Sequence, residues 1–394
     1  MARLSRVIAC AAALGCFLSP TAMAADSPTL ATSSTSVTVT GYPKLTVSRG
    51  STAFVASDAA SGRGPGTLSI IDGATASVTR TVPIGPGPMG LAVTPDGRRV
   101  VTTSWQEKAA RIMDGRSGAL IAKVPVGGQA DAVTIGPRGT SAFVYVIDKG
   151  YVARIDLRST KVKGRYPLTG CRKEQPVGMA VTPDSTMLLI SCDETGVILM
   201  STATGRVVKT LGNVAGGGAP VFSPDGSLAY VGASAYVTVI DIGARRVIGD
   251  STLIQKGDGG IDGVDSPMSL AVAPDGSAVY AVMPEVGQIS VLDPRTGAQV
   301  SRIAIGGKTL VGATAAIMGP GSRLSVVARS GLLSIDPATN TVVGTDPITP
   351  PGSGPSVNLL TPVLLDGSRV AITWATVDGD NALAGSGMTI LTVP

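Results

Sequence analysis

The chain has 394 residues, a formal net charge of +5, 44% hydrophobic residues, 15% charged residues and no histidine. The missing histidine excludes the usual general base, the Ser-His and Cys-His nucleophile pairs, and imidazole ligation of zinc, copper or haem. Aromatic residues make up only 3%, which disfavours a nucleic-acid platform of stacked rings, and the many apolar residues argue against disorder.

The first 24 residues have the three parts of an export signal. Arg3 and Arg6 give a positive start, residues 7–18 form a short apolar run, and Ala22-Met23-Ala24 supplies the small residues that signal peptidase needs. We therefore expect residues 1–24 to be a signal peptide. Its removal takes away two arginines and lowers the net charge from +5 to +3, too small an excess to suggest a polyanionic partner.

The mature protein is expected to be exported, to the periplasm or the extracellular space. A lipoprotein acylated at Cys16 is the alternative, although Ala13 stands where such signals usually carry leucine. Residues 25–34 are expected to be a Ser/Thr-rich linker. No later segment reaches the roughly 18 uninterrupted apolar residues of a membrane span.

A sequence motif, two β-rich runs that flank a Pro-Asp-Gly-type turn, recurs eight times along the rest of the chain. The last residues of these turns are Gly50, Gly97, Gly139, Ser185, Gly226, Gly276, Gly321 and Gly367, spaced 41 to 50 residues apart. A period of this size with several short strands per unit is typical of a propeller blade.

The second unit illustrates the expected strands, over residues 90–94, 98–103, 109–114 and 119–126. In its Pro95-Asp96-Gly97 turn, proline presets φ, aspartate accepts from the backbone ahead of it, and glycine accepts a positive φ. The third strand of a unit often ends in an aspartate with a serine or threonine three residues later, which predicts an Asx-type turn. The repeated aspartates are thus interpreted as turn formers.

The eighth unit contains only three strands before the chain ends, and the segment 35–40 near the N-terminus can supply the fourth. Open sheet edges are a liability, so we expect the ring to close through this strand. The prediction is an all-β fold, one β-propeller domain over residues 35–394 with eight four-stranded blades. Seven blades with an irregular extra hairpin is the alternative.

Three segments of the chain resemble the YVTN-type (YncE-like) β-propeller repeat. They are Pro88-Met-Gly-Leu-Ala-Val-Thr-Pro-Asp-Gly97, Pro176-Val-Gly-Met-Ala-Val-Thr-Pro-Asp-Ser185 and Tyr236-Val-Thr-Val-Ile-Asp241. The resemblance covers about residues 35–394. It implies the propeller fold but no particular function, because such propellers occur both as exported stand-alone proteins and as parts of cofactor enzymes.

The connections that do not follow the repeat are expected on one face of the ring, which is the candidate site. Cys171 and Cys192 of the fourth unit should both lie there, and the export signal makes a disulfide the expected state. The adjacent insert Arg172-Lys173-Glu174-Gln175 is a candidate contact for an anion or a partner, with a solvated loop as the alternative.

Two further groups depart from the repeat. Trp105 and Trp374 follow or end the second strands of their units and could stack a sugar or another flat ligand, the alternative being packing in the core or a loop. Acidic side chains alternating with glycine could hold Ca²⁺, and no other cofactor is expected; the candidate ligands are Asp258, Asp262, Asp265, Asp378 and Asp380.

The sequence favours a monomeric, non-enzymatic binding or scaffold module for a protein or cell-envelope ligand, without nucleic acid or membrane as partner. This interpretation leads because no catalytic constellation is recognisable. A carboxylate-metal hydrolase or lactonase, and an accessory propeller for a redox partner, are the alternatives.

Overall fold

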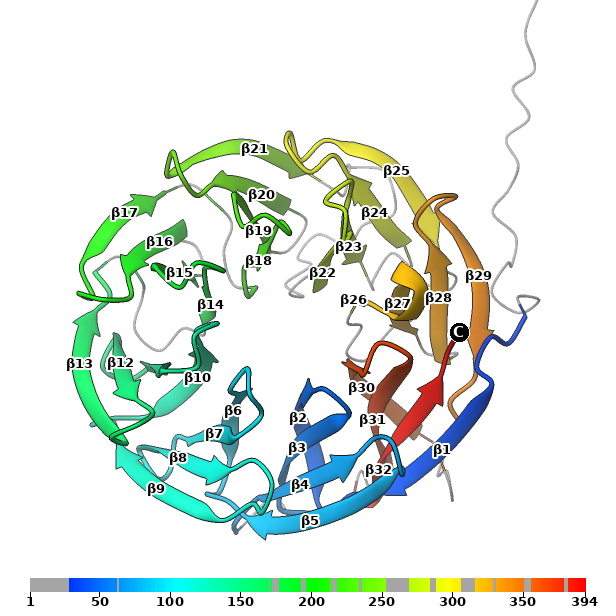
Figure 1. Cartoon of the computed structure of the whole chain (residues 1–394), viewed down its shortest axis with the longest axis horizontal. Helices are drawn as coiled ribbons and strands as arrows, with labels where there is room; N and C mark the ends of the chain where they lie inside the picture. The colour runs from blue at the N-terminus through cyan, green and yellow to red at the C-terminus, as the bar shows by residue number, and fades with distance from the viewer. Residues whose placement is uncertain are drawn as a thin grey trace, which may run out of the picture.

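Eight four-stranded antiparallel sheets are arranged around a ring, with the innermost strand of each sheet near the centre and the outermost at the rim (Figure 1). The structure is a computed structural model that describes residues 28–61, 64–169, 171, 177–192, 196–212, 214, 218–233, 236–252, 269–283, 288–305, 316–328, 331–350, 356–378 and 382–394. The eight-bladed β-propeller expected from the repeat is confirmed.

Seven blades are continuous in sequence, and each runs from the centre outwards as strands a, b, c and d. Blade 1 contains β2 (Tyr42–Arg49), β3 (Thr52–Asp58), β4 (Thr67–Asp72) and β5 (Ser77–Pro83). Blade 2 contains β6 (Pro88–Val93), β7 (Arg99–Ser104), β8 (Ala109–Asp114) and β9 (Leu120–Pro125). Blade 3 contains β10 (Ala130–Ile135), β11 (Ser141–Val146), β12 (Tyr151–Asp156) and β13 (Lys161–Pro167).

The next four blades follow the same order. Blade 4 contains β14 (Val177–Val181), β15 (Met187–Cys192), β16 (Gly196–Ser201) and β17 (Val207–Leu211). Blade 5 contains β18 (Val221–Phe222), β19 (Leu228–Ala233), β20 (Tyr236–Asp241) and β21 (Arg246–Thr252). Blade 6 contains β22 (Ser269–Val272), β23 (Val279–Met283), β24 (Gln288–Leu292) and β25 (Gln299–Ala304). Blade 7 contains β26 (Ala316–Met318), a 3-10 turn (Pro320–Ser322), β27 (Leu324–Ala328), β28 (Gly331–Asp336) and β29 (Thr341–Asp346).

Blade 8 joins the two ends of the described chain. Its strands are β30 (Ser356–Leu365), β31 (Arg369–Val377), β32 (Leu383–Thr392) and, at the rim, β1 (Ser33–Thr38). The register runs from Ser33 opposite Thr392 to Thr38 opposite Gly387. The predicted closure by an N-terminal strand is therefore confirmed, with a strand that begins two residues earlier than the sequence suggested.

The turn chemistry predicted from the repeat is also present. In blade 2 the Asp96 carboxylate accepts the Thr94 hydroxyl at 2.6 Å and the Arg98 backbone N–H at 3.0 Å, while Gly97 takes a φ of 71°. After strand c, Asp114 accepts the backbone N–H of Ser117 at 2.7 Å and its hydroxyl at 2.8 Å. These bonds satisfy turn N–H groups that have no partner in the sheet.

Because consecutive strands of each blade are antiparallel neighbours, the connections between strands lie alternately on the two faces of the ring. The a–b and c–d turns lie on one face, hereafter the turn face, and the b–c and d–a connections lie on the other, hereafter the loop face. Strands b and c are buried on both sides because each blade packs against the next. Between blades 1 and 2, for example, Phe54 and Leu68 pack in one apolar cluster with Val100 and Met113. Within the described residues there is no helix long and apolar enough to span a membrane.

Candidate functional site

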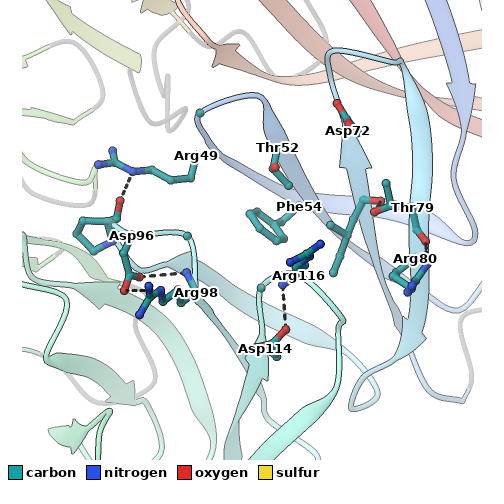
Figure 2. A pocket seen from close by; sticks show the side chains of 15 residues that line it. Arg49, Thr52, Phe54, Asp72, Thr79, Arg80, Asp96, Arg98, Asp114 and Arg116 are labelled. Carbon is teal, nitrogen blue, oxygen red and sulfur yellow. Dashed lines mark hydrogen bonds and ion pairs between the residues drawn. The ribbon is translucent and has the colours of Figure 1, made fainter.

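A groove of about 960 Å³ opens on the turn face between blades 1 and 2 (Figure 2). Its walls come from the a–b and c–d turns of both blades, and its floor includes Phe54 and Ile70 of the cluster that joins them. The charged lining side chains are four arginines and three aspartates, namely Arg49, Arg80, Arg98, Arg116, Asp72, Asp96 and Asp114. A groove of this volume has the size of many small-ligand sites.

Two of the arginines come from blade 1. Arg49 ends β2, and its Nε donates to the backbone carbonyl of Pro95 in the next blade, so this side chain crosses one end of the groove. Arg80 lies in the outer strand β5, where a terminal guanidinium nitrogen donates to the carbonyl of Thr79 at 2.6 Å. In Figure 2, Arg49 and Arg80 lie on opposite sides of Phe54.

The other two arginines come from the turns of blade 2. The Arg98 side chain is 85% exposed, and its Nε is 3.9 Å from the Asp96 carboxylate, so the ion pair between them is weak. Among the described residues, the Arg116 guanidinium has no hydrogen-bond or ion-pair partner, although the backbone N–H of Arg116 donates to Asp114. The groove therefore contains guanidinium N–H groups that the fold does not use.

The three aspartates, in contrast, are engaged in the turns. Asp72 accepts the backbone N–H groups of Ala74 and Thr75 at 2.7 and 3.3 Å. The Thr94 hydroxyl, and next the Arg98 N–H, lower the pKa of Asp96. The N–H and hydroxyl of Ser117 lower the pKa of Asp114. The three carboxylates serve chiefly to hold the turns that carry the arginines.

A tight backbone approach joins the two turns of blade 2. The N–H of Gly115 donates to the carbonyl of Arg98 at 2.8 Å, and a Cβ on Gly115 would overlap the carbonyl of Gly97. The turns that carry Arg98 and Arg116 are consequently locked together, which fixes their backbone positions at the groove wall.

The β4 side chain on the groove floor, Ile70, is apolar and shorter than the arginine at the equivalent place of blade 3. Ile70 pairs with Phe54 across β3 and β4, and at the equivalent place in blade 3 Arg154 pairs with Phe143. Arg154 extends between blades 3 and 4 and donates to Ser141 Oγ and the Ala203 carbonyl, both at 3.2 Å. That second groove has only about 120 Å³.

The sequence carries a signal for this site that sequence analysis did not use. Arg98 directly follows the last residue of its a–b turn, where the other seven repeats have serine or threonine: Ser51, Thr140, Thr186, Ser227, Ser277, Ser322 and Ser368. Arg49 stands where five other repeats have an aspartate: Asp96, Asp184, Asp225, Asp275 and Asp366. Comparing the repeats position by position would have singled out both residues.

On the loop face, the two candidate tryptophans have different environments and lie in different blades. Trp105 follows β7, is 37% exposed, and donates its indole N–H to the Asp131 carboxylate at 3.1 Å. Trp374 lies inside β31, is 3% exposed, and donates to Thr389 Oγ1 at 3.1 Å. Trp374 is thus a core side chain, while Trp105 is accessible to a ligand.

Asp131 is a buried carboxylate that sequence analysis missed. It lies in the inner strand β10 and is 6% exposed. Burial raises its pKa, against the opposing effect of the Trp105 N–H and the Ala132 backbone N–H. The equivalent residues in the neighbouring repeats, Met89 and Val177, are apolar, so a departure from the repeat could again have indicated the position.

The predicted Cys171–Cys192 disulfide is present, with a Cα–Cα distance of 5.5 Å. It joins the connection that follows β13 to the end of β15 on the loop face. The insert that follows it, Arg172-Lys173-Glu174-Gln175, lies outside the described residues. So do four of the five candidate calcium ligands, namely Asp258, Asp262, Asp265 and Asp380.

The fifth candidate ligand, Asp378, follows β31 and accepts the Ala382 N–H at 2.8 Å, a local turn contact. Within the described ranges, no three or more acidic or cysteine side chains gather as a metal site would require.

The fold places this chain in the class of eight-bladed β-propellers. No known family model matches the chain, and no curated protein matches it in sequence. Among solved structures, a chain of Kuenenia stuttgartiensis hydrazine synthase is similar, with a TM-score of 0.54 and 18% identity over 82% of this chain and 99% of that one. At this level of identity the similarity shows the fold alone.

Proposed function

We propose that this protein is an exported, monomeric, non-enzymatic binding module that holds a protein or cell-envelope ligand through the groove between blades 1 and 2. The observation that carries the proposal is the set of guanidinium groups in this groove that the fold does not use, on turns that the fold holds rigidly. Rigid presentation of unpaired polar groups in a concave site is what binding sites require.

Several sequence features support the rest of the proposal. The features of residues 1–24 support a signal peptide, followed by a short linker and one propeller that includes β1 from Ser33 onwards. The disulfide is consistent with export. The repeat phrases support a YVTN-like repeat, and the absence of histidine from the sequence supports a non-enzymatic role.

The loop face remains a second contact candidate within the same function. Trp105 is accessible there, and in the sequence the charged insert Arg172-Lys173-Glu174-Gln175, outside the described residues, directly follows Cys171. A partner that covers both faces would have to reach around the rim, so the two surfaces can be tested separately.

The experiment is recovery of a partner from envelope extract on the immobilised mature protein. The groove variant Arg49→Asp/Arg98→Ser carries residues that other repeats already have at these positions, so its fold should be kept. The loop-face variant is Arg172→Ala/Lys173→Ala/Glu174→Ala. We expect the groove variant to lose the partner and the loop-face variant to keep it. Equal recovery on wild type and the groove variant would count against the proposed site.

The same preparation tests the two alternative functions. Metal-dependent turnover of a lactone by the wild-type protein would overturn the non-enzymatic assignment. Recovery of a haem- or quinone-bearing subunit would instead favour an accessory propeller, and the similar chain from hydrazine synthase shows that this fold occurs in a protein named for an enzyme.

A further inference from the structure

We infer that the ligand of the groove between blades 1 and 2 is a compact molecule or glycan unit that carries two oxyanion groups, phosphate or carboxylate, on a neutral hydroxyl-bearing scaffold. The inference rests on the proposed function and specifies the chemistry that the groove recognises. Arg98 and Arg116 on the wall of blade 2, and Arg49 at the end of the groove, are the residues that bind the oxyanions.

The donors in the groove match oxyanions better than any other group. A guanidinium presents five N–H donors in a planar fork that fits a carboxylate or phosphate with two parallel hydrogen bonds. Within the described part of the chain, Arg49 uses only its Nε, toward Pro95, and the Arg116 guanidinium has no hydrogen-bond or ion-pair partner. Among the described residues, Arg98 has only the 3.9 Å approach to Asp96, so most of its donors are also available.

The arginines are spread along the groove rather than gathered at one point. In Figure 2, Arg49 and Arg98 lie on one side of Phe54, and Arg116 and Arg80 lie on the other. Guanidinium donors thus lie on both sides of the groove floor. A ligand with two separated oxyanions can contact both and gains from each pair of hydrogen bonds.

The aspartates set the limit on the charge of the ligand. Asp72, Asp96 and Asp114 line the same groove, and four arginines against three aspartates leave a surplus of one positive charge. A continuous polyanion would meet these carboxylates and be repelled, since like charges at close range are unfavourable. Hydroxyl groups between the two oxyanions can instead donate to the carboxylate oxygens that the turns leave open.

The volume fits a molecule of this kind. About 960 Å³ accommodates a ligand of sugar or disaccharide size, while the equivalent groove between blades 3 and 4 has about 120 Å³ because Arg154 occupies it. Only the first of these two grooves thus combines space with unused guanidinium groups.

Calorimetric titration with a graded set of probes tests the inference. Fructose 1,6-bisphosphate carries two oxyanions, fructose 6-phosphate one and fructose none, and glucarate carries two carboxylates in place of the phosphates. We expect each lost phosphate to weaken binding about tenfold, because a charge-assisted hydrogen bond contributes that much. Preference between the bisphosphate and glucarate tells a phosphate-bearing ligand from a sugar diacid.

Variants locate the binding. Arg98→Ser restores the residue type of the seven other repeats and should weaken binding of the better two-oxyanion probe about tenfold. Arg158→Ala is the matched control, because Arg158 has the position of Arg116 in the c–d turn of blade 3 and does not line the groove. It should leave the affinity unchanged within about twofold.

Two results would overturn the inference. Either the wild-type protein binds neither the bisphosphate nor glucarate, or it binds them equally well after Arg98→Ser. If the groove variant still loses the envelope partner in that case, the ligand chemistry is wrong and the proposed function stands. If the groove variant also recovers the partner as well as the wild type does, both the inferred ligand chemistry and the proposed function are wrong.

Discussion

The carboxylate of Asp346, at the end of β29, accepts the backbone N–H of Leu30 at 2.8 Å and also that of Ala31 at 2.7 Å. The bonded residues are 316 and 315 positions apart in the chain. The two bonds therefore attach the segment before β1 to blade 7. Asp346 is 1% exposed, and Leu30 packs against the apolar cluster that contains Trp374. The N-terminal segment is therefore fixed to one blade before it completes the next.

Replacement of Asp346 should weaken ring closure. Asp346→Ala removes two hydrogen bonds to a buried side chain, which we expect to lower the free energy of unfolding by about 1–3 kcal/mol. Asp346→Asn keeps an acceptor oxygen and should cost less than the alanine variant. Urea unfolding followed by circular dichroism measures both, and equal stability of Asp346→Ala and wild type would contradict the role assigned here.

Glu107 provides a pH-dependent contribution on the loop face. Its carboxylate accepts two bonds from Arg111, both 2.7 Å, and one from Lys123 at 2.8 Å. The Arg111 hydrogen bond, and next that of Lys123, lower its pKa from 4.5 to about 2. The stabilisation is thus complete above pH 4.5 and lost as the pH falls through 2.

Glu107→Gln should therefore lower the free energy of unfolding by about 2–3 kcal/mol at neutral pH. The difference from wild type should shrink below pH 4.5 and vanish near pH 2. Lys123→Met is the control with a smaller expected loss, because the Lys123 side chain is 44% exposed. A difference that does not change with pH would exclude the carboxylate as its source.

The buried Asp131 changes the pH dependence of stability in the direction opposite to Glu107. Burial raises its pKa in the folded protein above the ordinary 3.8, so the folded state binds a proton more tightly than the unfolded state does. Wild-type stability should rise as the pH falls through the folded-state pKa toward 3.8. Asp131→Asn keeps the acceptor for the Trp105 N–H and removes the buried charge, so it should raise the melting temperature at pH 7. This gain should disappear in acid, and a destabilised variant at pH 7 would contradict the argument.

The disulfide closes a loop whose ends are 21 residues apart. Its loss should lower the free energy of unfolding by about 3 kcal/mol. Thermal melts with and without dithiothreitol should show this for the wild type, while the double variant Cys171→Ser/Cys192→Ser should not respond to the reductant. Two free thiols in the exported protein, detected by mass spectrometry, would contradict the pairing.

Ser185 is the exception among the a–b turns that the repeat aligns. Its φ is 63°, where the equivalent Gly97, Gly226 and Gly276 have 71°, 71° and 74°. A side chain is disfavoured in this left-handed region, so Ser185→Gly should raise the free energy of unfolding by roughly 0.5–1 kcal/mol. Ser277→Gly is the matched control, since the Ser277 hydroxyl donates to Asp275 at 2.7 Å and its loss should destabilise.

The fold could be predicted because each blade repeats the same local chemistry. Turns such as Pro95-Asp96-Gly97 mark the strand pairs, and the missing strand of the last unit indicates closure by the N-terminal segment. Strand ends were less certain, since hydrogen bonding to neighbouring strands carries β31 to Val377, three residues beyond Trp374. This difference also explains why Trp374 is in the core.

The groove could not be predicted from turns alone, because its volume depends on which side chain fills the space between two blades. Ile70 leaves the first space open, whereas Arg154 occupies the equivalent one two blades further on. Arg98 and Arg49 could have been singled out as departures from the repeat. That they face one groove follows only from the packing of blade 1 against blade 2.

The pairing of Ser33 with Thr392 has a consequence for the order of folding. The two residues are 359 positions apart, whereas every other blade is made from strands that follow one another in the chain. The entropy of closing so long a loop means that single blades form quickly and the ring is completed last. Until β32 is in place, β1 has no partner, and the exposed edges of the unfinished ring must be kept from other chains. The pairing of β1 with β32 is therefore the event that commits this molecule to its native topology.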